Sequence, residues 1–152
     1  MDDILELTQF ADSDGFVTYE CPYCGSVFKL DAEDVNDDDF PIMDLFCPYC
    51  GLSGEMNRFI SYEAQEAIEA MVQNHLADIV NKEFGKMTRE INRAGGLIHM
   101  EFSPLKKQHV KEVKDNDTVE SIFTCDACVK KVKVVPNAGL SKAFCPYCGV
   151  DL

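Results

Sequence analysis

Apolar residues recur in steps of three and four along residues 61–94, the longest periodic stretch of the chain. The set comprises Ala64, Ala67, Ile68, Met71, Val72, Leu76, Ile79, Val80, Phe84, Met87 and Ile91. Steps of this size place side chains on one wide face of an α-helix. Ser61 has the character of a helix N-cap, and Gly95 and Gly96 form a stop signal. The pattern therefore predicts a helix over residues 61–94, with Gly85 as the place where it would bend or break.

The apolar stripe of this helix is too large for one small domain to cover. It must pack on the rest of the chain or on a second subunit. The sequence leaves both interpretations open: an intramolecular core, or a homodimer through residues 61–94. The flanking charges do not form a regular heptad, so the pattern does not predict an extended coiled coil.

Shorter stretches on either side of the helix have the composition of strands. They are residues 16–20, 26–30, 98–102, 118–124 and 129–135, while Leu45 and Phe46 lead into Cys47. Over 98–102, Ile98, Met100 and Phe102 alternate with His99 and Glu101, which is the pattern of a half-buried strand. Residues 136–139, Pro-Asn-Ala-Gly, predict a hairpin turn after the last strand.

The first 14 residues are acidic and carry scattered apolar side chains. Ile4, Leu7 and Ala11 fall near one helical face. The segment predicts either a short helix docked on the body of the protein or a disordered acidic docking motif, and the sequence does not separate the two.

All eight cysteines lie in four Cys-x-x-Cys pairs. Two residues between the cysteines let a tight turn aim both sulfurs at one point, which supplies half of a tetrahedral metal site. Chain separations favour two local sites, one of Cys21, Cys24, Cys47 and Cys50 and one of Cys125, Cys128, Cys145 and Cys148. Interleaved pairing, in which the first pair closes with the last, is the alternative, and it closes longer loops at greater entropic cost.

Three of the pairs read Cys-Pro-Tyr-Cys-Gly, at residues 21–25, 47–51 and 145–149. The proline presets φ for the turn, and the glycine allows the positive φ that turns backbone N–H groups toward sulfur. The remaining pair, Cys125-Asp-Ala-Cys-Val129, lacks both residues. Its turn is expected to differ in geometry more than in its ability to bind metal.

These Cys-Pro-x-Cys-Gly knuckles resemble those of the zinc-ribbon and rubredoxin-like families, over about residues 16–58 and 118–152. The resemblance implies two small three-stranded ribbons, each holding one metal ion. Structural Zn²⁺ is the expected ion, and iron, which rubredoxin binds with the same knuckles, is the competitor. A disulfide framework or a series of redox thiols fits the paired spacing less well.

The fold class expected is α+β, with two three-stranded antiparallel zinc ribbons joined by a long or bent helix. The domains would be an acidic segment over 1–14, a first ribbon over 15–60, a helical connector over 61–96, and a second ribbon with extra strands over 97–152. Ribbons of this size usually need a metal ion in order to fold alone.

The formal net charge is −13, and it is unevenly distributed. Residues 1–60 hold 14 acids and two bases, whereas residues 95–152 hold seven acids and eight lysines. This asymmetry suits an acidic, partner-facing first half, head-to-tail self-association, or a solvated acidic face that aids solubility. Net repulsion opposes non-specific nucleic-acid binding. The alternative is a local nucleic-acid face on the second ribbon. Its residues would be Lys106, Lys107, Lys111, Lys114, Lys130, Lys131 and Lys133.

The start of the chain lacks a basic n-region, and no apolar run approaches the length of a membrane span. We therefore expect a soluble, cytoplasmic protein with no membrane partner. No catalytic motif stands out, and all eight thiolates would be used in closed shells, which predicts a binding protein and not an enzyme. The function expected is a zinc-binding adaptor for protein partners. Its alternatives are a nucleic-acid-binding regulator and a rubredoxin-like iron electron carrier.

Overall fold

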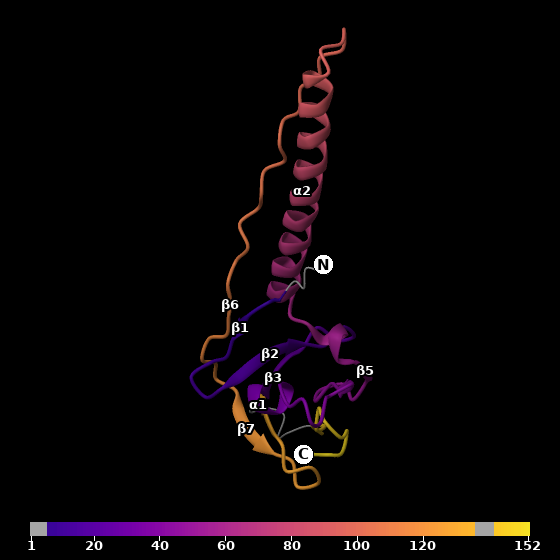
Figure 1. Ribbon diagram of the computed structural model, residues 1–152. Helices are drawn as coiled ribbons and strands as arrows, with labels where there is room; N and C mark the ends of the chain where they lie inside the picture. The colour runs from indigo at the N-terminus through magenta and orange to yellow at the C-terminus, as the bar shows by residue number, and fades with distance from the viewer. Residues whose placement is uncertain (1–5, 136–141) are drawn as a thin grey trace. The chain divides into compact units, whose positions relative to one another are not determined.

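The computed structural model describes residues 6–135 and 142–152 (Figure 1). The chain divides into two compact units. Unit 1 consists of Met1–Leu7 and Glu66–Glu112, and unit 2 consists of Thr8–Gln65 and Val113–Leu152. Unit 2 contains all eight cysteines, and unit 1 contains most of the long helix.

The centre of unit 2 is a four-stranded antiparallel sheet, β2-β3-β8-β7 (Figure 1). Its strands are β2 (Phe16–Glu20), β3 (Val27–Asp31), β8 (Lys131–Val134) and β7 (Ser121–Thr124). The two middle strands come from opposite halves of the chain, with Lys29 paired to Lys133 and Leu30 to Val132. Each half thus contributes one central and one outer strand to a single sheet.

Two separate three-stranded ribbons are therefore not confirmed. The α+β class is confirmed, since one long helix accompanies several antiparallel strands. The physical reason for the difference is burial. Phe28 and Leu30 on β3 and Val132 and Val134 on β8 are fully buried, and the pairing of β3 with β8 joins them in one core that neither half could form alone.

Short elements complete unit 2. A hairpin of β4 (Asp44–Phe46) and β5 (Ser53–Glu55) leads into the 3₁₀ helix η1 (Met56–Phe59), and α1 (Ala32–Val35) follows β3. Near the start of the chain, β1 (Gln9–Phe10) pairs in parallel with β6 (Val113–Lys114). The short helix proposed for residues 1–14 is thus absent from residues 6–14, while Ile4 lies outside the described residues.

A buried charge cluster ties the two halves of the sheet together. Asp12 accepts hydrogen bonds from Lys29 Nζ at 3.0 Å and from Lys133 Nζ at 2.8 Å, and all three side chains are almost fully buried. Burial alone would raise the pKa of Asp12, but hydrogen bonds from Lys133, the Phe16 N–H and Lys29 outweigh it and hold the pKa far below its usual range. Lys133 also contacts Asp14 at 2.7 Å.

The predicted helix is confirmed as α2 (Tyr62–Arg93), which contributes its residues from Glu66 onward to unit 1. Ser61 caps it, since the Ala64 N–H donates to Ser61 Oγ at 3.3 Å. Gly85 lies within the helix and does not interrupt it. Gly95 adopts a φ of 66° just beyond the last turn, which is the stop that the sequence indicates.

The return segment of unit 1, residues 97–112, is not a strand, so the strand predicted over 98–102 is wrong. The segment is instead bound to α2 by three asparagines, each of which donates to and accepts from one backbone position. Asn74 pairs in this way with Gln108, Asn81 with Leu105, and Asn92 with Met100, at 2.7–3.0 Å. We call these three pairs the asparagine ladder.

The spacing of the ladder explains why it fits. Seven residues from Asn74 to Asn81 rise about 10.5 Å along a helix. Three residues of extended chain, from Leu105 to Gln108, cover about 10 Å. The helix and the returning chain therefore stay in step, and Figure 1 shows the segment running alongside α2.

The apolar stripe of α2 is only partly covered within unit 1. Phe84 stacks on Phe102 with ring centroids 5.8 Å apart, and the small Ala70 and Ala77 are buried. Several of the larger apolar side chains on the helix stay substantially exposed, namely Val72, Leu76, Ile79, Phe84 and Met87. An intramolecular core built on the whole stripe is thus not what the described residues show. Within the same residues, no helix has both the length and the hydropathy needed to cross a membrane.

Candidate metal centres

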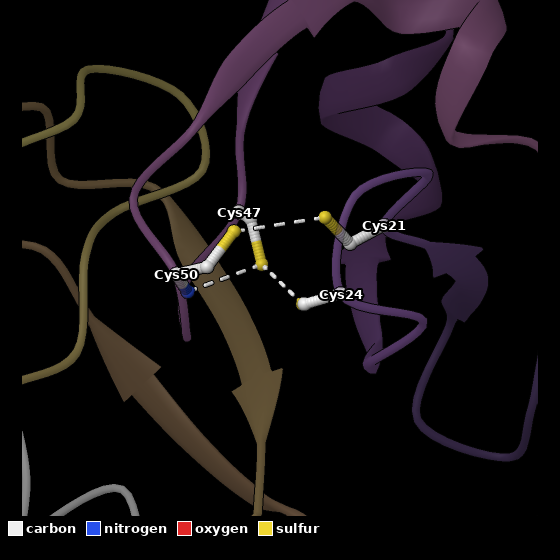
Figure 2. Close-up of side chains that lie close together, drawn as sticks. All are labelled: Cys21, Cys24, Cys47 and Cys50. Carbon is white, nitrogen blue, oxygen red and sulfur yellow. Dashed lines mark hydrogen bonds between the residues drawn. The ribbon is translucent and has the colours of Figure 1, made fainter.

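The eight cysteine side chains gather into two groups of four in unit 2. Site 1 is Cys21, Cys24, Cys47 and Cys50, and site 2 is Cys125, Cys128, Cys145 and Cys148. Figure 2 shows the side chains of site 1 converging from two turns. The grouping is the local one that chain separation favours, and interleaved pairing is not observed.

The sulfur positions suit a tetrahedral ion. All Sγ atoms within a site lie within 4.8 Å of one another. The Cys21–Cys50 and Cys24–Cys47 pairs are 3.8 and 3.7 Å apart in site 1, and the Cys125–Cys148 and Cys128–Cys145 pairs are 3.7 and 3.6 Å apart in site 2. A tetrahedral Zn²⁺ with Zn–S bonds of about 2.3 Å separates its ligands by about 3.8 Å. The residues present therefore fit a four-thiolate metal ion.

All four turns share one backbone pattern. In the first, the Cys21 N–H donates to Ser26 O and the Gly25 N–H donates to Cys21 O, both at 2.9 Å. The same two bonds recur in the other three turns at 2.7–3.0 Å. In addition, the Tyr23 N–H points at Cys21 Sγ and the Tyr49 N–H at Cys47 Sγ, each at 3.4 Å. Such N–H groups stabilise thiolate charge.

The third turn reaches this geometry at a cost. Gly25, Gly51 and Gly149 close their turns with φ of 69–74°, a range that glycine adopts freely. Val129 closes the third turn with φ of 62° and is the positive-φ residue other than glycine among the described residues. A β-branched residue is strained there by roughly 1–3 kcal/mol. The expected departure in turn geometry is therefore wrong, and the difference appears as strain.

The sheet positions both sites in the same way. Strand β2 leads into Cys21 and β7 into Cys125, while β3 and β8 carry the chain away from those turns. Strand β4 delivers Cys47, and an isolated bridge between Phe144 and Asp151 flanks the Cys145 turn. Each site is thus built from one turn on the sheet and one turn beside it.

Ionisation differs strongly within each site. Burial raises the pKa of Cys47 and of Cys145 above the ordinary thiol range. Burial also acts on Cys24 and Cys125, but hydrogen bonds from Ser26 to Cys24, and from the N–H groups of Cys128 and Ala127 to Cys125, lower those pKa values to about 7. A divalent cation, held by four thiolates, would stabilise all of them together and cross-link the two turns. A four-sulfur donor set suits Zn²⁺ and iron alike.

The seven lysines of the proposed nucleic-acid face do not act as one exposed set. Lys133 is 3% exposed and bound to Asp12 and Asp14, so in this conformation it cannot reach a phosphate. Lys130 pairs with Asp34 at 3.6 Å and lies over the Tyr147 ring. In unit 1, Lys107 pairs with Asp78 and Lys111 with Glu66. Lys106, Lys114 and Lys131 are exposed.

The sequence did not predict the contacts between the two sites. Phe46 and Phe144, each directly before a cysteine, lie against the glycine of the opposite site. An aromatic residue at the same place in two otherwise similar turns, Phe46-Cys47 and Phe144-Cys145, was the available signal. No family model, curated protein or solved structure matches this chain.

Proposed function

We propose that the protein is a non-catalytic zinc-binding module that serves as an adaptor for a protein partner. The observation that carries the metal-binding part is the pair of four-sulfur groups. In each group all Sγ atoms lie within 4.8 Å of one another, and two Sγ–Sγ distances of 3.6–3.8 Å match those of a tetrahedral metal–thiolate site. A closed four-thiolate shell leaves no position for a substrate, which supports a structural over a catalytic role.

The adaptor role rests on surface chemistry in unit 2. Residues 31–44 contain seven acids and no base. Among them, Phe40 and Met43 are each 74% exposed, beside Asp37, Asp38 and Asp39. Exposed apolar side chains beside a run of acids suit a basic partner that also offers apolar contact. The exposed apolar residues of α2 support a second proposal, a homodimer through residues 61–94.

Metal content per chain tests the first part. Protein purified without added metal should contain two zinc ions per chain by elemental analysis. Iron with visible absorbance would favour the electron-carrier alternative, and absence of any metal would overturn the module itself. Sedimentation at micromolar concentration tests the homodimer, which a monomer would exclude.

The adaptor role needs a matched pair of variants. Asp37→Asn/Asp38→Asn/Asp39→Asn with Phe40→Ser removes the proposed surface, whereas Glu63→Gln removes an exposed acid elsewhere in unit 2. A specific partner identified with the wild-type protein should be lost with the first variant and kept with the second. A partner that both variants retain would place the interaction on another surface.

A further inference from the structure

We propose that the two metal sites are energetically coupled, so that filling one increases the affinity of the other. This inference rests on the proposed metal binding. It concerns the second turn of each site, residues 47–51 and 145–149, which hold one another in unit 2 through a reciprocal set of contacts. We call this set the interlock.

Two backbone hydrogen bonds form the first part of the interlock. The Phe46 N–H donates to Pro146 O, and the Phe144 N–H donates to Pro48 O, both at 2.9 Å. Pro48 and Pro146 lie inside the Cys-Pro-Tyr-Cys-Gly turns and are fully buried. Each donor directly precedes a metal-site cysteine and each acceptor lies within the opposite site, so the ligand-bearing backbone of one site is bonded to that of the other.

Two ring contacts form the second part. A methyl group added to Gly149 would lie 2.9 Å from the Phe46 ring, and one added to Gly51 would lie 3.0 Å from the Phe144 ring. Each ring therefore occupies the space that the absent side chain leaves. The first turn of site 1 has no such neighbour, because the same methyl group on Gly25 would meet nothing within 4 Å.

A tyrosine adds a third connection. Tyr49, in the second turn of site 1, donates its hydroxyl to Val27 O at 3.1 Å and accepts from the Val135 N–H at 3.0 Å. Val135 directly follows β8, the strand that comes from the half of the chain that carries site 2. The hydroxyl thus bridges the two halves beside the sites.

These contacts imply coupling because short turns owe their order to the metal. Without an ion in site 1, the 47–51 turn loses its fixed geometry, and with it the surfaces that hold Phe144 and the 145–149 turn. Binding of the first ion therefore includes the entropy loss of ordering both turns. The second ion binds turns that are already partly ordered, so its binding loses less entropy and is tighter. Coupling between linked sites usually amounts to about 5–150-fold in affinity.

The first test disables site 2 in the full chain with Cys128→Ser/Cys148→Ser and measures zinc binding by site 1 in competition with a chelator. These two cysteines are the more accessible of site 2, so the buried Cys125 and Cys145 remain. We expect site 1 to bind zinc about 5–150-fold more weakly than in the wild-type protein. Unchanged affinity would overturn the coupling and leave metal binding intact, whereas a wild-type protein that binds no zinc would overturn both.

A second test keeps all eight cysteines and remains informative if the double variant does not fold. Gly149→Ala and Gly25→Ala both place alanine at positive φ, but only the first pushes against a residue of the opposite site. With cadmium-113 as the NMR-visible probe ion, we expect Gly149→Ala to shift the site 1 resonance and to speed cadmium loss from site 1 to a chelator. Gly25→Ala should leave the site 2 resonance in place. A site 1 resonance that Gly149→Ala does not move would contradict the coupling.

Discussion

Units 1 and 2 are stabilised in opposite ways. Unit 2 buries a core of Phe28, Leu30, Phe59, Val132 and Val134 and a charge cluster, and it brings together two groups of thiols. Unit 1 holds a returning chain on one helix through side-chain amides and leaves large apolar residues exposed. Small domains that lack a large core depend on cross-links. We therefore expect unit 2 to lose stability when the metal or a buried charge is removed. We expect unit 1 to open locally when an asparagine of the ladder is replaced.

Metal removal should give the largest difference between the units. Structural zinc contributes roughly 10–16 kcal/mol in small metal-dependent domains, against a typical domain stability of roughly 5–15 kcal/mol. All five tyrosines belong to unit 2, so near-ultraviolet circular dichroism of tyrosine reports on that unit. Chelation should abolish the tyrosine signal while much of the far-ultraviolet helical signal from α2 persists. Tyrosine dichroism that survives complete zinc removal would show that unit 2 folds without metal.

Asp12→Asn should give the next largest effect, confined to unit 2. Removing one partner from a buried ion pair costs about 3–5 kcal/mol, and this variant leaves two buried lysines without their shared carboxylate. Because the pKa of Asp12 is lowered in the folded protein, its contribution is present above its ordinary pKa of 3.8 and is lost as the pH falls through the folded value. The difference in unfolding free energy between the wild-type protein and Asp12→Asn should therefore be largest at pH 7 and decrease below about pH 4. Urea unfolding at each pH measures this difference.

Asp14→Asn is the matched control for this prediction. Asp14 contacts Lys133 at 2.7 Å, but its side chain is 57% exposed. An exposed pair contributes about 0–1 kcal/mol, so this variant should remain close to the wild-type protein. Equal losses from both variants would show that the buried position of Asp12 is not what matters.

Asn81→Leu tests unit 1 at one rung of the ladder. It removes the bonds to the Leu105 N–H and C=O, which together contribute about 1–3 kcal/mol. Amide exchange at Leu105 should accelerate by about tenfold for each 1.4 kcal/mol lost, while the tyrosine signals of unit 2 stay unchanged. Lys82→Ala, at the exposed neighbouring position, is the control and should leave that exchange rate alone.

Val129→Gly should give the smallest effect, and it should be stabilising. The variant relieves about 1–3 kcal/mol of backbone strain, which stabilises the folded state. Glycine also gives the unfolded chain more conformational freedom, which destabilises the folded state by about 0.5–1 kcal/mol, so we expect a net stabilisation of about 1 kcal/mol. The urea midpoint of the zinc-loaded protein should rise. Gly25→Val reverses the change in an equivalent turn and should lower the midpoint. A midpoint that falls in Val129→Gly would show that the valine side chain contributes more than its strain costs.

Local signals in the sequence were sufficient for the helix and the cysteine groups. Apolar periodicity, an N-cap and a glycine stop placed the helix over 61–94, and the structure has Tyr62–Arg93. The Cys-x-x-Cys spacing predicted the four turns, because a turn of four residues depends on its own backbone. The chain separations between the pairs predicted their local grouping, because shorter loops close at lower entropic cost. The metal ligation itself stays a prediction.

Long-range features were not predictable in this way. The pairing of β3 with β8 depends on apolar residues from the N-terminal and C-terminal halves of the chain packing in one core. The composition of a strand does not show which other strand it will pair with. Lys29 and Lys133 have the sequence character of surface residues, and only their joint contact with Asp12 explains their burial. The alternation at 98–102 predicted a strand, but Met100 pairs there with the Asn92 side chain and not with another strand.

The asparagine ladder sets a rule for how unit 1 can change in length. One rung advances seven residues along α2 and three along the returning chain, and the next advances eleven and five, from Asn81 to Asn92 and from Leu105 to Met100. A single inserted residue on either side would shift every rung beyond it out of reach. An insertion or deletion that keeps the ladder must therefore change α2 and the returning chain together, by about two helix residues for each residue of returning chain. Related chains should then differ in the length of unit 1 by complete asparagine–backbone pairs with the helix and chain residues between them.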